Sequence, residues 1–286
     1  MSDIRLAVIG GSGMYDMESL SDVEELDIPT PFGAPSDTIV LGTLLGTRIA
    51  FLPRHGRGHR LTPTEVPYRA NIWALKSLGV ERIVSVSACG SMRKRYHPRD
   101  IVLPDQIYDN TKARDYSFFG HGLVAHVSFA EPFCPHLRGL LYEAATTSGG
   151  RVHLGGTFLT IEGPRFSTKG ESRMYRSWGV DIIGMTAVPE AQLAREAEIC
   201  YATMAHVTDY DVWHKEEEPV TVQMLIDNLV ANAALSKRTI ATLVPLLSDD
   251  RPCGCGDALA TAIITRRDLI PAETVGRLRP IVGKYL

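Results

Sequence analysis

Short apolar runs recur along this chain and mark the strands of a sheet. The runs Ile4–Ile9, Arg82–Ser87 and Ile199–Ala205 are rich in apolar residues and lead into glycine, small or acidic side chains. Runs of this length between polar segments are typical of strands buried on both faces. Further strands are predicted at Ile39–Leu44 and Arg48–Leu52, which look like a hairpin, and at Asp100–Gln106, Val152–Glu162 and Val180–Ile183.

Between these runs lie segments whose apolar residues recur every three or four positions. Thr64–Leu78 has this spacing and stops at Gly79, so it is predicted to be a helix. Further helices are predicted at Pro135–Ser148, from an N-cap at Ser167 to Trp178, at Val188–Ile199, at Val220–Leu247 and, as two short stretches, after Ser248. Strands that alternate with helices predict a layered α/β fold. No linker divides the chain, so we expect one domain with a C-terminal extension.

The composition excludes several classes of protein. Of the 286 residues 44% are apolar and 22% are charged, which is ordinary for a soluble globular chain. The net charge of −3 comes without a block of Lys and Arg, so we expect no nucleic-acid partner. No apolar segment approaches the about 18 residues that cross a membrane, and no signal pattern opens the chain. We therefore expect a cytoplasmic protein without a membrane partner, and a solvated loop at the acidic run Glu216–Glu218.

The five cysteines are Cys89, Cys134, Cys200, Cys253 and Cys255. In a reducing compartment their ordinary role is that of small buried apolar side chains. Cys253 and Cys255 are too close in sequence for an ordinary structural pair, and no C-x-x-C or His cluster completes a zinc set around them. The sequence therefore predicts no metal site.

A glycine-rich loop at residues 10–13 follows the first predicted strand. It suggests a dinucleotide-binding loop, but Asp16 stands where the last glycine of the fingerprint belongs, and no acidic residue ends a second strand about twenty positions on. An NAD-dependent dehydrogenase is therefore not favoured. The backbone N–H groups and the Ser12 hydroxyl still suit an anion, and a tight turn without a ligand is an equal alternative.

Cationic and hydroxyl side chains follow other predicted strands. Residues 53–60 carry Arg54, His55, Arg57, His59 and Arg60, and the planar fork of arginine matches phosphate oxygens. This density of cations predicts an anion site rather than a plain solvated loop.

Small or aromatic groups at three more segments can complete such a site. The segments 87–91 and 184–186 carry hydroxyls at strand ends, and Phe166 follows a Gly-Pro turn. An aromatic ring in that position can stack on a base, although a packed turn explains it equally well. The polar loop 109–126 has the length and composition of a binding loop.

Asp209 and Asp211 stand one residue apart at the end of a buried strand. Open α/β sheets bind their ligands outside the carboxyl ends of strands. Two carboxylates there can hold Mg²⁺ or contact a purine base. Because the other candidate groups are cationic or neutral and form an anion site, we predict that this pair holds a base.

Taken in order, these segments resemble the trimeric purine nucleoside phosphorylase family from about residue 4 to residue 247. Eight motifs carry the resemblance: Gly10–Gly13, Arg54–Arg57 with His59, Asn71–Lys76, Ala88–Ser91, Ala130–Pro135, Ile161–Ser167, Met185–Glu190 and Thr208–Trp213. Each is modest alone, and eight in order are specific. The resemblance implies a central mixed sheet flanked by helices, with a phosphorylase domain at 1–247 and a C-terminal extension at 248–286 packed on it.

The resemblance assigns expected roles residue by residue. The positions expected to hold phosphate are Ser12, Arg54, His55, Ser87, Ala88 and Thr186. Met185 would lie against the ribose and Phe166 would stack on the base. Ser167 and Val222 match positions associated with substrate choice. His126 matches a histidine that a neighbouring subunit lends to the 5′ pocket, which implies a homotrimer.

The two aspartates would carry the release of the base. Cleavage of an N-glycoside by phosphate passes through a sugar cation, and a carboxylic acid near N7 can protonate the leaving purine. Asp209 is assigned to N7, and Asp211 to the 6-amino group. Phosphate is a co-substrate and the nucleophile, oriented by Arg54 and His55, so no metal or organic cofactor is expected.

Asp209 also predicts which purine is accepted. Family members that cleave 6-oxopurines carry Asn there, because an ionised Asp would face the 6-oxygen acceptor to acceptor. The expected reaction is phosphorolysis of S-methyl-5′-thioadenosine to adenine and 5-methylthioribose 1-phosphate, a step in methionine and purine salvage. The alternatives are a 6-oxopurine or methylthioinosine phosphorylase, a broad purine nucleoside phosphorylase, and a nucleosidase that uses water.

Two features depart from the pattern of the animal enzymes. Gly184 replaces an Asn before the Met-Thr pair, a change associated with microbial members. The chain also continues past the shared core through Cys253 and Cys255. In thermophilic relatives such tails form disulfides with cysteines at positions like Cys134 and Cys200, and the resemblance leaves open whether these do.

Overall fold

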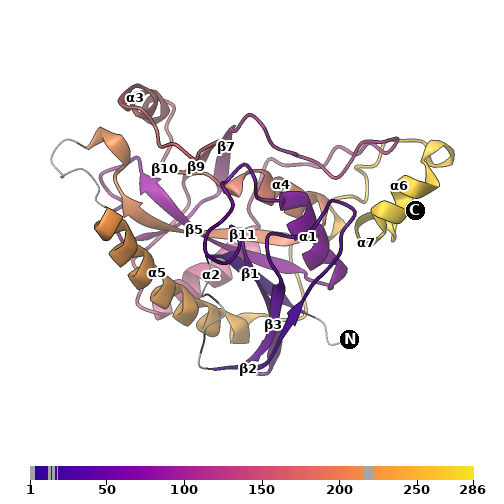
Figure 1. The fold of residues 1–286 in the computed structure, drawn as a ribbon, viewed down its shortest axis with the longest axis horizontal. Coiled ribbons are helices and arrows are strands. Elements are labelled where there is room, and N and C mark those ends of the chain that lie inside the picture. The colour runs from indigo at the N-terminus through magenta and orange to yellow at the C-terminus, as the bar shows by residue number, and fades with distance from the viewer. Residues whose placement is uncertain (1–3, 12–13, 15–16, 18, 215–221) are drawn as a thin grey trace.

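A single mixed sheet runs through the molecule (Figure 1). The computed structural model describes residues 4–11, 14, 17, 19–214 and 222–286, with the backbone alone at 222–229. The strands are β1 (Leu6–Gly10), β2 (Leu20–Leu26), β3 (Ile39–Leu44), β4 (Thr47–Pro53), β5 (Arg82–Ser91), β6 (Ile101–Leu103), β7 (Gln106–Asn110), β8 (Val152–Leu154), β9 (Thr157–Ile161), β10 (Ile182–Gly184) and β11 (Cys200–Asp209).

Helices connect these strands and close the chain. They are α1 (Tyr68–Ser77), α2 (Pro135–Thr147), α3 (Lys169–Ser177), α4 (Ala187–Glu196), α5 (Val222–Leu243), α6 (Ala272–Arg277) and α7 (Arg279–Val282). Short 3₁₀ turns are η1 (Asp211–Trp213), η2 (Val244–Leu246), η3 (Gly254–Asp257) and η4 (Arg267–Leu269). This alternation confirms the α/β class and the mixed sheet flanked by helices.

Strand β5 is the centre of the sheet. It pairs in parallel with β1 along its first half and with β11 from Arg82 to Gly90, and its end pairs antiparallel with β10. One branch of the sheet continues through β10, β9 and β7, and the other through β11, β6 and β8. The carboxyl ends of β1 and β11 therefore meet beside the second half of β5, where the candidate chemistry lies.

Helices cover both faces of the central strands. Along β1, Ala7 and Ile9 pack into one apolar core with α1, α4 and α7, whereas Leu6 and Val8 pack into another with α2 and α5. Figure 1 shows α2 and α5 on one side and α1, α4 and α7 on the other. Successive strand side chains point to opposite faces, so a strand buried on both reads as a continuous apolar run.

The C-terminal tail packs on the same body. Trp73 Nε1 donates to the Arg277 carbonyl at 3.0 Å, and Ala125 forms a β-bridge with Ile263. These contacts support our proposal that residues 248–286 are an extension of a domain formed by residues 1–247. No helix in the described part of the chain is long and apolar enough to cross a bilayer.

Several predicted boundaries are wrong, each for a local reason. The strand predicted at Val152–Glu162 is two strands, because Gly155 and Gly156 between them adopt φ of +94° and +126°. The N-cap of α3 is Thr168 instead of Ser167, since the Thr168 hydroxyl accepts the Glu171 N–H at 3.1 Å and the Glu171 carboxylate accepts the Thr168 N–H in a capping box.

Two other strands also differ from the prediction. The strand predicted at Asp100–Gln106 is split between β6 and β7, and β7 takes up the first residues of the polar loop at 109–126. Strand β2 was not predicted, because its polar residues lie exposed at the edge of the sheet. The acidic run Glu216–Glu218 lies outside the described residues.

Candidate active site

A cavity of about 510 Å³ opens where β1, β5, β10 and β11 end. It brings together ten predicted site residues: Arg54, His55, Ser87, Ala88, Phe166, Ser167, Met185, Thr186, Asp209 and Asp211. Ser12 and the side chain of Val222 lie outside the described residues. His126 is absent from the described residues that line the cavity. Ten of the predicted site residues thus line a single cavity.

Two hydroxyls define one end of the cavity. Ser87 Oγ and Thr186 Oγ1 lie 3.4 Å apart, although 99 positions separate them in the chain. Ser87 belongs to β5, and Thr186 follows β10 directly. The fold therefore builds from distant segments the hydroxyl pair that an anion needs.

Arg54, next to these hydroxyls, forms a buried ion pair that the sequence did not predict. Its Nε lies 2.8 Å from Glu190 Oε2, and its Nη2 lies 2.9 Å from Oε1. Burial alone would lower the pKa of Arg54, but the charge of Glu190 and its hydrogen bonds raise it well above the usual value. Nη2 also donates to Ser85 Oγ at 2.6 Å, and Nη1 to the Val86 carbonyl at 3.0 Å. Arg54 therefore links the end of β4 to the middle of β5 as well as lining the cavity.

His55 is held as a neutral acceptor. Its Nδ1 lies 2.8 Å from the Leu61 carbonyl, and because a carbonyl can only accept, Nδ1 carries the proton. Burial, aided by the charge of Arg54, lowers the pKa of His55 to about 4. At neutral pH the ring is uncharged and Nε2 can accept a hydrogen bond from a ligand hydroxyl.

The two aspartates define the other end of the cavity. The Asp211 N–H donates to Asp209 Oδ1 at 2.7 Å, and the Thr208 hydroxyl donates to Asp209 Oδ2 at 2.7 Å. Ser172 Oγ donates to Asp211 Oδ2 at 2.5 Å. Burial raises the pKa of Asp211, while the Ser172 hydrogen bond opposes that rise. A register shift in the β11–β5 pairing between Val207 and Asp209 marks where this arrangement begins.

Glycines allow the walls of the cavity to close. A Cβ on Gly90 would lie 3.1 Å from Asp209 Oδ1. At Gly163, with φ of +71°, a Cβ would lie 2.6 Å from Met185 Sδ. Glycine thus lets the backbone at 90 approach Asp209 closely, and the positive φ at 163 favours glycine over any other residue.

Phe166 and Ser167 also line the cavity. The Phe166 side chain is 68% exposed at the cavity, which leaves its ring available to a ligand. The Ser167 hydroxyl is buried and has no hydrogen-bond partner among the described residues. Both observations fit residues that contact a bound molecule.

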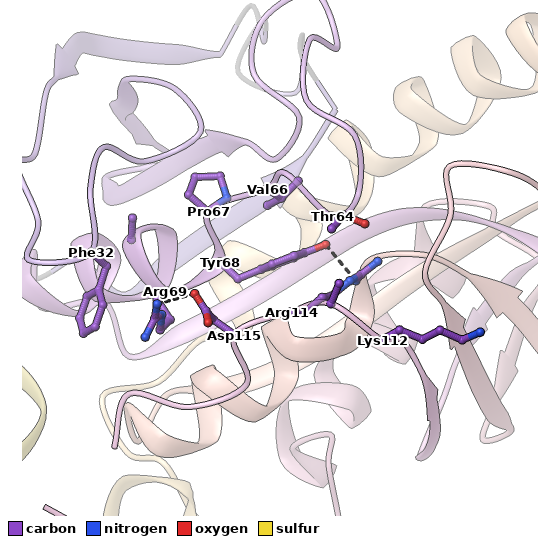
Figure 2. A pocket seen from close by; sticks show the side chains of 11 residues that line it. Phe32, Thr64, Val66, Pro67, Tyr68, Arg69, Lys112, Arg114 and Asp115 are labelled. Carbon is purple, nitrogen blue, oxygen red and sulfur yellow. Dashed lines mark hydrogen bonds and ion pairs between the residues drawn. The ribbon is translucent and has the colours of Figure 1, made fainter. Parts of the chain in front are cut away.

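Arg114 supports the cavity from behind, and sequence reasoning missed it. Its side chain is fully buried, with Nη1 donating to the Met185 carbonyl at 2.7 Å and Nη2 to the Glu162 carbonyl at 2.8 Å. Figure 2 shows Arg114 beside Tyr68 in a neighbouring cavity of about 320 Å³. The loop predicted at 109–126 thus positions the backbone of Met185, and a single arginine in a polar loop gave no signal of this.

A second missed group lies deep in the cavity. His206, Asn232 and Ser236 line it, and the Ser236 hydroxyl lies 2.7 Å from His206 Nε2. Burial lowers the pKa of His206 to about 4. These residues stand among apolar residues in the sequence, so no local pattern indicated that they line the cavity.

One group of metal-ligating type is present in the described part of the chain, and it lies outside the cavity. It consists of Cys134, Cys200, Cys253 and Cys255. No C-x-x-C or His cluster was found around Cys253 and Cys255 in the sequence, and the structure brings Cys134 and Cys200 to them from distant positions. Neither Asp209 nor Asp211 belongs to such a group.

Known proteins are similar to this chain in sequence and in fold. The phosphorylase superfamily profile matches residues 5–245. A protein of Geobacter sulfurreducens named S-methyl-5′-thioadenosine phosphorylase is 55% identical, over 98% of this chain and 99% of its own. One of that name from Koribacter versatilis is 53% identical, over 98% and 96%.

Solved structures of methylthioadenosine phosphorylases are also similar to this chain in fold. A methylthioadenosine phosphorylase from an Antarctic soil metagenomic library superposes with a TM-score of 0.95 at 49% identity, over 98% of this chain and 99% of that chain. The Schistosoma mansoni methylthioadenosine phosphorylase in complex with adenine gives a TM-score of 0.85 at 36% identity, over 93% and 100%.

Proposed function

Because the chain belongs to the phosphorylase superfamily, and within it to the S-methyl-5′-thioadenosine phosphorylases, we propose how its cavity performs the reaction of that family. The enzyme is a pentosyltransferase that converts S-methyl-5′-thioadenosine and phosphate into adenine and 5-methylthioribose 1-phosphate. One observation carries the assignment of the site. A hydroxyl pair with a neutral imidazole lies at one end of the cavity, and two carboxylates lie at the other.

Phosphate occupies the end formed by Ser87 and Thr186. The two hydroxyls donate to its oxygens, and the neutral His55 accepts a hydrogen bond from a phosphate hydroxyl through Nε2. Arg54 contributes less charge than a free arginine, because Glu190 balances it. The site therefore orients the nucleophile towards C1′ more than it activates it.

The purine lies between Phe166 and the aspartates. Asp209 already accepts hydrogen bonds from the Thr208 hydroxyl and the Asp211 N–H, which suits a carboxylate that also accepts from the 6-amino group. Burial raises the pKa of Asp211, so Asp211 is the better proton donor to N7. This assignment exchanges the roles that the resemblance suggested for Asp209 and Asp211. Both residues still contact the base.

Cleavage then transfers one proton to the purine and the sugar to phosphate. The bond between C1′ and the purine nitrogen breaks as phosphate oxygen approaches C1′, and the proton from Asp211 neutralises the leaving base. No metal or organic cofactor takes part in these steps. Met185 lies against the ribose, with its carbonyl fixed by Arg114.

Product analysis tests this function. Purified enzyme with methylthioadenosine should release adenine only when phosphate is added, with 5-methylthioribose 1-phosphate appearing in equal amount by ³¹P NMR. Adenine release without phosphate would point to a nucleosidase. Rates for adenosine, methylthioinosine and inosine measured in parallel test the base, and equal rates for 6-amino and 6-oxo substrates would contradict the role of Asp209.

The homotrimer is a further part of the proposal. His126 is fixed by its N–H, which donates to the Ala262 carbonyl of the tail at 2.9 Å, and it is absent from the described lining of the cavity. A copy of the chain can supply it to a neighbour. Sedimentation should give three chains per particle. Mixing inactive His126→Ala and Asp211→Asn variants should restore part of the activity if each cavity uses two chains.

A further inference from the structure

The side chains of four cysteines from three distant parts of the chain lie close together. Their Sγ atoms all lie within 4.8 Å of one another, and Cys200 Sγ is 3.4 Å from Cys253 Sγ. Cys134 is the N-cap of α2, Cys200 begins β11, and Cys253 and Cys255 belong to the tail at η3. Cys134, Cys200 and Cys255 are buried, and Cys253 is partly buried.

We propose that this cluster, Cys134, Cys200, Cys253 and Cys255, binds one Zn²⁺ ion as a tetrahedral four-thiolate site. With Zn–S bonds of about 2.3 Å, the sulfurs of a tetrahedral site lie about 3.8 Å apart. Four sulfurs that are all mutually close match one central ion, whereas two disulfides need only two close pairs. Binding converts four thiols into thiolates, so one Zn²⁺ enters as up to four protons leave to solvent.

The surroundings suit negatively charged sulfur. The Leu137 N–H, in the first turn of α2, donates to Cys134 Sγ at 3.5 Å. A backbone N–H group of this kind offsets part of the net charge of a zinc ion with four thiolates.

The site is structural, because β11 separates it from the chemistry. Cys200 begins this strand of ten residues and Asp209 ends it, a span of about 30 Å. The ion would fasten the tail to α2 and β11. The same tail is held by Glu198, which accepts hydrogen bonds from the Leu259 N–H and the Tyr285 hydroxyl. It also carries the Ala262 carbonyl that receives the His126 N–H.

Metal content and thiol content together test the proposal. Enzyme purified without a metal-affinity tag or chelator should contain about one zinc per chain by mass spectrometry of the elements. Denatured with chelator and without reductant, it should show all five thiols reactive to DTNB. No zinc with one reactive thiol would mean two disulfides and would overturn the proposal. Five thiols in protein that takes up no zinc on reconstitution would overturn it too.

Variants locate the ion. Cys255→Ser should lose the zinc and melt at a lower temperature, while its rate well below that temperature stays within about twofold of the parent. Cys89→Ser is the matched control, since Cys89 lies outside the cluster, and it should keep its zinc. If Cys255→Ser does not fold, Co²⁺ exchanged into the parent should show the visible bands of tetrahedral thiolate cobalt. Colourless or octahedral cobalt would refute the site.

Discussion

The backbone N–H of Asp211 donates to the carboxylate of Asp209 at 2.7 Å, so the chain itself fixes the two acids relative to each other. Each carboxylate has a further hydroxyl donor, from Thr208 for Asp209 and from Ser172 for Asp211. The two acids therefore differ in their surroundings although they are neighbours in sequence. Under the proposed function, that difference allows Asp209 to recognise the base and Asp211 to protonate it.

Asp209→Asn should change which purine the enzyme prefers. The amide can donate to a 6-oxygen, whereas it loses an acceptor for the 6-amino group, so the ratio of kcat/KM for methylthioadenosine over methylthioinosine should fall by about 10- to 100-fold. Asp211→Asn is the matched comparison, and it should lower kcat for both substrates with little change in their ratio. A ratio that moves with Asp211→Asn and not with Asp209→Asn would return the roles to those first expected.

Glu190→Gln should destabilise the fold. It leaves the Arg54 guanidinium buried without its counter-charge, and breaking a buried ion pair by removing one partner costs about 3–5 kcal/mol. Urea unfolding of the variant should show this loss. Asp268→Asn removes one partner of the exposed Arg266–Asp268 pair and is the control, with little expected effect. Equal losses in the two variants would show that the buried pair is not important to stability.

Glu196→Gln should remove part of the pH dependence of stability. Burial raises the pKa of Glu196 to about 7 from an ordinary value of 4.5, despite hydrogen bonds from Ser117 and Phe118. The folded state thus binds this proton more tightly than the unfolded state. The stabilising contribution is complete below pH 4.5 and is lost as pH rises through 7.

A glutamine stays neutral, so the variant should be more stable than the parent at pH 8, by on the order of 3 kcal/mol. At pH 5 the difference should be small, which serves as the internal control. Urea unfolding of both proteins at the two pH values measures it. His55 and His206 titrate alike in both proteins, so their effects cancel in the difference. A variant less stable than its parent at pH 8 would contradict the raised pKa.

Phe166→Ala should weaken nucleoside binding and leave stability unchanged. Stacking of an aromatic side chain on a base is worth about 1–3 kcal/mol, so KM for methylthioadenosine should rise about 5-fold or more. Its KM for phosphate should stay the same. Leu269→Ala removes a side chain of similar exposure, 62% against 68%, from the tail and should change neither constant. An unchanged nucleoside KM would remove Phe166 from the base site.

Most strands of the fold could be predicted from the sequence, because a strand buried on both faces must be apolar at nearly every position. Strand β2 was not, since it lies at an edge and its polar residues obey no burial pattern. The break between β8 and β9 was also hidden. Two adjacent glycines permit a turn of the chain, but the positive φ of Gly155 and Gly156 depends on what surrounds them.

The site was predicted where a motif exposes its chemistry and was missed where two distant residues act together. Arg54 was identified and Glu190 stands in the Met185–Glu190 motif, but their ion pair across 136 positions was not predicted. Arg114 was missed in the same way, whereas only the resemblance brought the four cysteines together. A single sequence shows residue types and local spacing, and it does not show which far segments come into contact.

The pairing of β5 with β11 also sets when an active site can first exist. The Thr208 hydroxyl oxygen, at the end of β11, lies 3.2 Å from the Cys89 carbonyl oxygen of β5, across 119 positions of sequence. A ribosome adds about 5–20 residues per second, so β11 is synthesised several seconds after β5. A nascent chain that ends before residue 209 has the hydroxyls and the histidine but no acids, and no nucleoside can bind it productively. Substrate can therefore stabilise only chains whose synthesis has passed that point.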